Sequence, residues 1–303
     1  MILHQYPDGD SIGCTLAVAR ALALLGKQTV VCGEGRFPAT YRFLPGAAAV
    51  RSWEEAGGGF DTAVLFDCAE PALTGRGEEF RQRAATVINA DHHRSNSRYG
   101  DLNWVDPTAA AAGELAMSLV DELGAPLDPE IATCLYTSLI TDTGDFRYES
   151  TTAATHRMAA RLLEAGVRPG RVSEALYESR PLGALRLLSL ALGRLEVTPG
   201  GRVAWISLPR ELLVAAGAAE EDVEGIVNYP RSLAGVQVAL LLRETADGRI
   251  KVSVRTREPV DAGALAREFG GGGHARAAGC VLAGPLEQAR GLLVAAAGRA
   301  VGG

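Results

Sequence analysis

Short apolar segments alternate with longer amphipathic ones over the first half of the chain. Four β-rich segments mostly lack polar alternation, as do strands buried on both faces of a parallel sheet; they are residues 1–6, 28–32, 62–68 and 85–89. Residues 11–26 have a helical pattern that ends at Gly26. This β-α-β alternation predicts a doubly wound α/β domain with a mostly parallel sheet.

The pattern changes twice further along the chain. Predicted helices dominate the middle, at residues 106–124, 128–141, 151–166, 171–179 and 181–196. From about residue 196, two hairpins turn at Pro-Gly-Gly and Ala-Asp-Gly, and a helix at 261–269 follows them. The predicted organisation is a first domain at 1–170, a helical connector at 171–195 and a smaller α+β domain at 196–303.

Composition narrows the class of protein. The 303 residues are 47% apolar and 22% charged, which is ordinary for a soluble globular protein. A formal net charge of -6 argues against a basic surface for long nucleic acids or anionic membranes, but it permits a small local anion site. The apolar stretch at 291–298 is too short to span a bilayer.

The number and spacing of the cysteines and the first ten residues indicate the cellular compartment. The five cysteines are scattered, odd in number and form no C-x-x-C pair, so we expect neither a zinc knuckle nor a disulfide framework. The opening MILHQYPDGD has no basic region followed by an apolar run, so no signal peptide is predicted. We therefore expect a cytoplasmic protein.

Acidic and imidazole side chains gather where predicted elements end. Three predicted strands and one predicted helix supply them: His4, Asp8 and Asp10; Asp67; Asp91, His92 and His93; and Asp142 and Asp145. Each group alone has an ordinary explanation, because a lone histidine is more often packed than ligating and Asp-Gly-Asp is often a turn. Three of the four groups share one edge of an open α/β sheet, where ligand sites form, and this favours a site.

The residue types at this edge indicate metal chemistry. Carboxylates and imidazoles without a thiolate suit divalent ions such as Mn²⁺ or Mg²⁺. So many carboxylates around one ion would repel one another and raise one another's pKa values, whereas two ions sharing one carboxylate would relieve the repulsion. A two-metal site can clamp the attacking and leaving oxygens of an in-line phosphoryl displacement.

Five motifs, taken in order, resemble a known family. HQYPDGDSIG, LFDC, NADHH and ITDTGDFRY look like the motifs of the DHH phosphoesterase superfamily, and GGGGHARAAG looks like the signature of its associated C-terminal domain. The resemblance spans nearly the whole chain and is nearest to the nano-RNase branch, oligoribonucleases that also act as 3'-phosphoadenosine 5'-phosphate phosphatases. Relatives usually carry a helical lead before the first strand, whereas Met1 here lies three residues before His4.

The resemblance implies a role for each acidic and imidazole residue. It implies that His4 and Asp8 hold one ion, with Asp67 bridging to the second. It implies that the second ion is held by Asp10, His92 and Asp142. Asp91 would orient the histidine pair, and His93 would point at the phosphate or the leaving oxygen. The residues alone do not distinguish Asp142 from Asp145; the TDTG match selects the former. The two ions are expected to be Mn²⁺, with Mg²⁺ as the alternative.

The glycine-rich segment is the second candidate. A glycine run alone is as often a flexible loop as a site, but this one follows a predicted amphipathic helix. Glycine lets backbone N–H groups approach an anion, and arginine can fork onto phosphate. The predicted phosphate or nucleotide clamp comprises Gly272, Gly273, His274 and Arg276. Arg255 and Arg257 are candidate helpers, for which a solvated strand edge is an equal alternative.

These observations lead to one hypothesis and several alternatives. The chain is expected to hydrolyse very short oligonucleotides to mononucleotides, and 3'-phosphoadenosine 5'-phosphate to AMP, in a cleft between its two domains. A cyclic-dinucleotide or pyrophosphate hydrolase, a RecJ-like exonuclease and a non-catalytic nucleotide-binding module are the alternatives. The chain lacks the Arg-Lys-Lys cluster of the pyrophosphatases and the extra basic domain of the exonucleases. Long nucleic acid and membrane partners are not expected, and a homodimer is left open.

Overall fold

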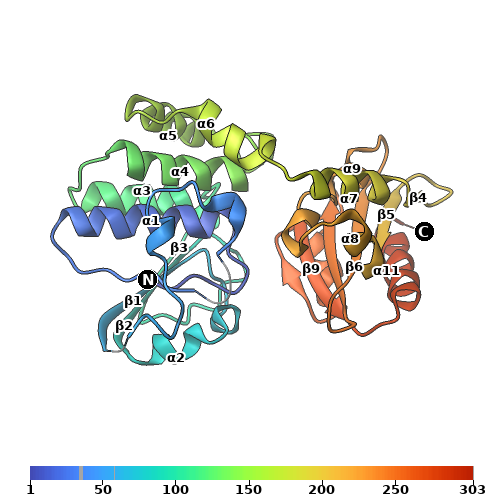
Figure 1. Ribbon diagram of the computed structural model, residues 1–303, viewed down its shortest axis with the longest axis horizontal. Coiled ribbons are helices and arrows are strands. Elements are labelled where there is room, and N and C mark those ends of the chain that lie inside the picture. Colours follow the sequence, from blue (N-terminus) through green and yellow to red (C-terminus); the bar gives the residue numbers. More distant parts are fainter. Residues whose placement is uncertain (34–36, 58, 303) are drawn as a thin grey trace. The chain divides into compact units, whose positions relative to one another are not determined.

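The computed structural model describes residues 1–33, 37–57 and 59–302, and it divides the chain into two compact units (Figure 1). The first unit is Met1–Ser179 and the second is Arg180–Gly303. Each unit has its own sheet and its own hydrophobic core. The α/β first part and the α+β second part confirm the predicted fold class.

The sheet of the first unit is parallel. Its strands are β1 (Phe60–Phe66), β2 (Ala84–Asp91) and β3 (Leu102–Val105), in the order β1-β2-β3. β1 and β2 lie where the sequence predicted strands. β3 was not predicted, because it is a four-residue edge strand that alternates exposed and half-buried positions. Since parallel strands end at the same edge, the residues after β1 and β2 lie close together.

The two strands predicted at 1–6 and 28–32 are wrong in extent. Among the described residues, these segments form only single parallel bridges, between Ile2 and Cys32 and between Cys32 and Arg51. Ile2 N donates to Val64 O (3.0 Å), so this segment does run beside β1. The ladder stops because Gln5 N donates instead to Leu73 O, outside the sheet.

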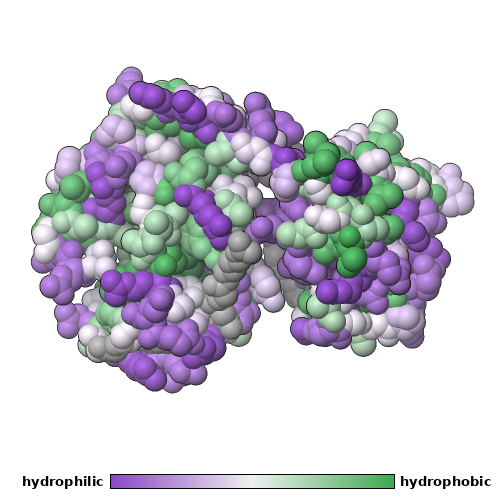
Figure 2. Space-filling model, in the orientation of Figure 1, coloured by the Kyte–Doolittle hydropathy of each residue, from purple (hydrophilic) through white to green (hydrophobic). Residues whose placement is uncertain are grey.

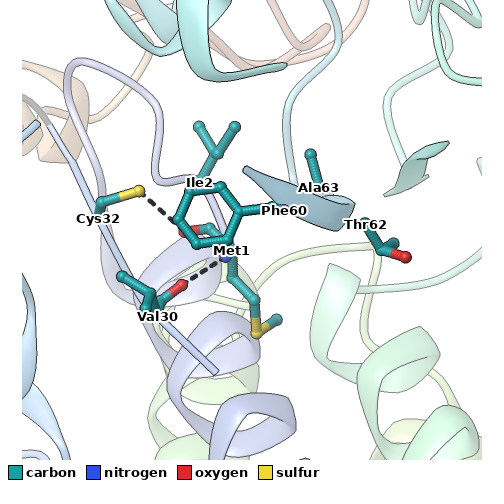
Figure 3. A pocket seen from close by; sticks show the side chains of 7 residues that line it. All are labelled: Met1, Ile2, Val30, Cys32, Phe60, Thr62 and Ala63. Carbon is teal, nitrogen blue, oxygen red and sulfur yellow. Dashed lines mark hydrogen bonds between the residues drawn. The ribbon is translucent and has the colours of Figure 1, made fainter. Parts of the chain in front are cut away.

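The N-terminal segment also lines a small pocket (Figure 3). The amino group of Met1 donates to Val30 O (2.6 Å), and Cys32 Sγ donates to Met1 O (3.5 Å). The remaining lining residues are Ile2, Phe60, Thr62 and Ala63. Because none of the seven carries a carboxylate or an imidazole, this pocket is distinct from the candidate site.

The first unit contains a set of helices, most of which contribute residues to its largest core. They are α1 (Gly9–Leu24), α2 (Gly77–Gln82), α3 (Ala112–Glu122), α4 (Pro129–Asp142), α5 (Ala153–Glu164) and α6 (Pro169–Ser173), followed by a π-helical turn at Glu174–Glu178. The side chains of Asp8 and Asp128 cap α1 and α4. Hydrophilic residues gather over α5 and α6 on the face drawn in Figure 2.

The helix predicted at 106–124 begins six residues later than expected. Asp106 Oδ1 accepts hydrogen bonds from Thr108 N (2.9 Å) and Thr108 Oγ1 (2.7 Å), and this local turn competes with the helix. α3 therefore begins at Ala112, and its first N–H groups are directed at Asp10.

The second unit has a six-stranded mixed sheet. Its strands are β4 (Leu195–Val197), β5 (Val203–Leu208), β6 (Val238–Glu244), β7 (Ile250–Thr256), β8 (Gly272–Gly273) and β9 (Ala277–Leu282), in the order β4-β5-β6-β7-β9-β8. Both predicted hairpins, β4–β5 and β6–β7, are confirmed. Among the described strands of this sheet, β5 and β6 are the one parallel pair of neighbours.

Helices cover both faces of the second sheet, which explains why β5 is buried along its whole length. On one face, apolar residues of α10 (Ala262–Arg267) and α11 (Leu286–Ala300) form a core with the sheet. On the other, α7 (Leu182–Leu192) and α8 (Arg210–Ala216) do so. The parallel step from β5 to β6 passes through α8 and α9 (Asn228–Ser232), two short helices that were not predicted.

Two general predictions concern cysteines and membranes. All five cysteines are buried and free, as expected for a chain without a disulfide framework. Among the described residues, no helix is both long and apolar enough to cross a membrane.

Candidate metal centre

The acidic and imidazole residues come together at one end of the first unit. β1 runs into Asp67, and β2 ends on Asp91 and is followed by His92 and His93. The start of α1 and the end of α4 bring in the others. These are Asp8 and Asp10, at the α1 N-terminus, and Asp142, the last residue of α4.

The first group of candidate ligands comprises His4, Asp8 and Asp67, whose ligand atoms lie within 4.8 Å of one another. Tyr6 N donates to His4 Nδ1 (3.3 Å), so Nε2 is the ring nitrogen left for a metal ion. Asp8 Oδ1 accepts from two N–H groups of α1, each at 3.1 Å, which leaves Oδ2 for a ligand. Burial lowers the pKa of His4 and so favours its neutral, metal-binding form.

The second group comprises Asp10, His92 and Asp142, again with ligand atoms within 4.8 Å of one another. His92 Nε2 lies 3.7 Å from Asp10 Oδ2 and 3.5 Å from Asp142 Oδ2. His92 Nδ1 lies 3.1 Å from the carbonyl oxygen of Ala109, and a carbonyl can only accept. Nδ1 therefore carries a proton in either state of the ring, and when the ring is neutral Nε2 has the lone pair that a metal ion needs.

Asp67 connects the two groups. Its Oδ1 lies 3.4 Å from His92 Nε2 of the second group, while the residue belongs to the first. Asp67 also has a φ of 53°, a left-handed conformation that is uncommon outside glycine. Such strain occurs where the surrounding structure holds a side chain in a required direction, and functional sites are a common location.

Asp91 is an anion held by donors. Its Oδ1 accepts from His92 N (2.8 Å) and from His93 Nδ1 (2.7 Å), and its Oδ2 accepts from Asn96 Nδ2 (2.5 Å). Burial raises the pKa of Asp91, but the hydrogen bonds from His93 and Asn96 outweigh it and bring the pKa to about 2. Asp91 is therefore ionised and fixes the ring of His93 through Nδ1.

The opposite shift is found in three acids of the candidate ligand groups, because the pKa values of Asp10, Asp67 and Asp142 are raised. Burial, followed by the Asp10 carboxylate, raises the pKa of Asp142 to about 8. Burial also raises the pKa of Asp10, and burial with the neighbouring carboxylates raises that of Asp67 well above its usual range. These acids cannot all be ionised together without a compensating cation.

A divalent cation fits this site. Asp67 Oδ1 is buried and accepts no hydrogen bond of normal geometry from the described residues. Burial lowers the pKa of His92, but the carboxylates of Asp67, Asp10 and Asp142 outweigh burial and raise this pKa to about 11. In the metal-free protein a proton on His92 thus provides the positive charge that a metal ion would supply. The acidic and imidazole groups are positioned to bind divalent metal ions.

Asp145 lies outside both ligand groups. Its Oδ1 accepts from Tyr177 Oη (3.0 Å), and its Oδ2 pairs with Arg147 (3.3 Å). It follows Gly144 and precedes Phe146 in a run of three left-handed residues. The turn after α4 therefore directs this carboxylate away from the role that Asp142 can take.

The predicted clamp residues lie on, or directly beside, neighbouring strands of the second unit. Arg255 of β7 pairs in register with Ala277 of β9, and His274 N donates to Ala277 O (2.8 Å). Arg276 already has partners, because it donates to Val260 O (2.7 Å) and to Glu258 Oε1 (2.8 Å). The exposed Arg257 donates to Arg231 O (3.1 Å).

Close packing accounts for part of the glycine run. A Cβ on Gly271 would overlap Gly279 O, and one on Gly273 would lie 2.6 Å from Ala277 O. Gly273 also has a φ of 136°. By contrast, Gly272 is exposed and a Cβ there would meet nothing within 4 Å. The run forms a tight hairpin, β8–β9, rather than a flexible loop.

Two polar residues at the centre were not anticipated. Asn96 supports Asp91, and Ser138 donates to Asp10 from the turn of α4 before Asp142. Neither has a sequence signal, because an isolated serine or asparagine is common in any chain. Only the packing of distant segments identifies them.

Comparison with known proteins bears on both units. A family model described as "DHH family, N-terminal domain" matches residues 1–139, and one described as "DHHA1 domain" matches residues 210–302. The chain is 38% identical, over 94% of its length and 85% of the relative's, to a protein of Thermus thermophilus named bifunctional oligoribonuclease and PAP phosphatase NrnA. A Bacillus subtilis protein of the same name is 28% identical over 92% and 88%.

A solved structure extends the likeness to three dimensions. An exopolyphosphatase-related protein from Bacteroides fragilis superposes with a TM-score of 0.90 at 26% identity. The match covers 98% of this chain and 91% of that one. The whole chain therefore shares its fold with that protein.

Proposed function

The chain belongs to the DHH family and carries a DHHA1 domain, and from its site we propose a metal-dependent phosphoesterase that hydrolyses very short oligonucleotides to mononucleotides. The second proposed activity is the removal of the 3'-phosphate from 3'-phosphoadenosine 5'-phosphate. The observation that carries the proposal is the pair of three-residue ligand groups, with Asp67 between them.

The proposed ligands follow from the two groups. One ion would be held by His4 and Asp8. The other ion would be held by Asp10, His92 and Asp142. Asp67 would contact both ions. When bound, two such ions supply Lewis-acid chemistry, lowering the pKa of water and neutralising charge on the phosphate. We propose Mn²⁺ over Mg²⁺, because each group contains an imidazole and Mg²⁺ prefers oxygen ligands.

His93 and Asp91 are the proposed acid–base residues. Asp91 Oδ1 holds His93 through Nδ1, so Nε2 is the nitrogen that can donate a proton to the leaving oxygen or a hydrogen bond to the phosphate. Asp91 stays ionised and keeps the ring oriented. Its role is to position His93, as carboxylates behind a functional imidazole commonly do.

The second unit supplies the proposed substrate-binding residues. Backbone N–H groups at Gly272 and Gly273, with His274 and Arg276, would hold a phosphate, and Arg255 and Arg257 would add positive charge. Arg276 is only half-buried and its ion-pair partner Glu258 is largely exposed, so a phosphate can compete for the guanidinium.

The preference for short substrates is supported by charge and by the relatives. Long nucleic acids are held by many phosphate contacts, which require a basic track, whereas this chain has a net charge of -6. The names of the Thermus and Bacillus relatives specify an oligoribonuclease and a PAP phosphatase. Nucleotides beyond the first few would gain little affinity here.

A substrate panel tests the proposal. Purified protein with Mn²⁺ is incubated with RNA of two to twenty nucleotides, 3'-phosphoadenosine 5'-phosphate, a cyclic dinucleotide and pyrophosphate, and the products are separated by chromatography. We expect mononucleotides from the dinucleotide, AMP from the phosphatase substrate, and kcat/KM that falls with length. If kcat/KM rises steadily into long polymers, the chain is instead an exonuclease with an extended binding groove.

A further inference from the structure

Ser138 has an unusual hydrogen bond for a helical serine. Its Oγ lies 2.5 Å from Asp10 Oδ1, 128 residues away in the sequence, and both side chains are buried. The neighbouring hydroxyls of α4 behave differently. Thr137 and Thr141 each donate to a backbone carbonyl four residues earlier (2.9 Å), as hydroxyls in helices usually do.

The two carboxylate oxygens of Asp10 accept different numbers of hydrogen bonds, and Ser138 increases the difference. Oδ1 accepts from Ser138 Oγ, from Gly113 N (3.1 Å) and from Cys14 Sγ (3.3 Å). Oδ2 accepts only from Ala112 N (2.7 Å) among the described residues, and it is the oxygen paired with His92 Nε2. The protein therefore saturates Oδ1 and leaves the remaining capacity on Oδ2.

Two glycines make room for this arrangement. A Cβ on Gly113 of α3 would overlap Ser138 Oγ, and one on Gly13 of α1 would lie 2.9 Å from Ser138 Cβ. α1, α3 and α4 thus approach closely around a single hydroxyl. The hydroxyl is enclosed by backbone on two sides, so its direction toward Asp10 is fixed by packing.

We propose that Ser138 is a positioning residue that makes Asp10 a one-oxygen ligand for the metal ion held with His92 and Asp142. By occupying Oδ1, the hydroxyl fixes the rotation of the carboxylate and presents Oδ2 to the ion. It does not touch the substrate or the ion, and the other ligand group does not depend on it. This inference rests on the proposed two-metal site.

The test is a metal titration of full-length protein stripped of metal. Mn²⁺ binding is followed by calorimetry and by the electron paramagnetic resonance of free Mn²⁺, for the wild type, Ser138→Ala and Thr137→Val. Loss of a partner that orients a metal ligand costs roughly 10- to 100-fold in affinity. Ser138→Ala should bind one of the two ions about 10-fold more weakly and should bind the other with unchanged affinity. Thr137→Val removes an equally buried hydroxyl of the same helix and should leave both affinities unchanged.

Each outcome separates this inference from the proposed function. If the wild type binds no Mn²⁺, the two-metal site is wrong. If it binds two ions and Ser138→Ala binds both with wild-type affinity or weakens both equally, or if Thr137→Val weakens the same ion as much as Ser138→Ala does, the role of Ser138 is wrong. Gly113→Ala provides a second variant, since its methyl group displaces the hydroxyl without removing it, and it should weaken the same ion. Circular dichroism verifies that each variant is folded.

Discussion

Asp91 and Asp142 have the same side chain and opposite environments. Asp91 is surrounded by donors, which bring its pKa to about 2 against the effect of burial. Asp142 has carboxylate neighbours, and burial with their charge raises its pKa to about 8. An acid of the first kind orients its neighbours, whereas one of the second kind gains most from a metal ion.

Asp142→Asn and Asp145→Asn form a matched pair three residues apart. Asp142→Asn removes a proposed ligand, so kcat should fall by more than the roughly 10- to 100-fold typical of an outer partner. Asp145→Asn disturbs only the contacts with Tyr177 and Arg147 and should keep most of the rate. Both are measured with a dinucleotide at saturating Mn²⁺. Equal losses would show that the TDTG segment had been assigned wrongly.

Arg276→Ala should separate substrate binding from metal binding. Removing a charge-assisted hydrogen bond to phosphate costs about 1.5–3 kcal/mol, which raises KM by roughly 10- to 100-fold. The metal content, measured by mass spectrometry, should not change. Arg299→Ala, which breaks an exposed ion pair with Glu268, is the control and should leave KM unaltered. A variant that loses metal would place Arg276 in a different role.

At the scale of elements, the glycine hairpin β8–β9 allows a sharp comparison of neighbouring positions. In Gly271→Ala the new methyl group overlaps Gly279 O, a backbone atom that cannot move easily, and overpacking of this kind costs about 1–3 kcal/mol. Gly272→Ala meets open space and should keep the wild-type melting temperature. Calorimetry of the two variants measures the difference. Equal melting temperatures would mean that the hairpin is not packed as described.

The sequence predicted best the elements that carry their own signals. α1 and α4 begin at aspartate caps, and the hairpins turn at Pro-Gly-Gly and Ala-Asp-Gly, so local chemistry determined them. The segments at 1–6 and 28–32 have strand composition, but their pairing depends on distant partners and reduces to single bridges. β3 and α9 are too short for a periodic signal.

The gathering of the candidate ligands at one place was predictable for a related reason. Asp67 and His92 lie at or just after the end of a strand-like segment and His4 lies near the end of another, and the ends of such segments share one edge. The support of Asp10 by Ser138 and of Asp91 by Asn96 was not predictable, because it depends on side-chain packing between segments. The hydrogen-bond partners of Arg276 could not be predicted from the sequence for the same reason.

At the scale of the whole molecule, all proposed ligands belong to the first unit, Met1–Ser179. A ligand that binds only the folded state stabilises it, by about 2.7 kcal/mol at a concentration 100 times its Kd. Saturating Mn²⁺ should therefore slow hydrogen exchange within residues 1–179 and leave exchange in the second sheet unchanged. Exchange is measured by mass spectrometry with and without metal. Equal protection of both units would contradict the assignment of the ligands.

The central claim is that metal-dependent hydrolysis takes place at the Asp67-linked ligand groups. The most direct measurement is the rate of dinucleotide hydrolysis by chelator-stripped protein as Mn²⁺ is added back. We predict no turnover without metal, a rate that rises to a plateau as two ions per chain bind, and no such recovery in Asp142→Asn. Full activity in excess chelator would contradict the account.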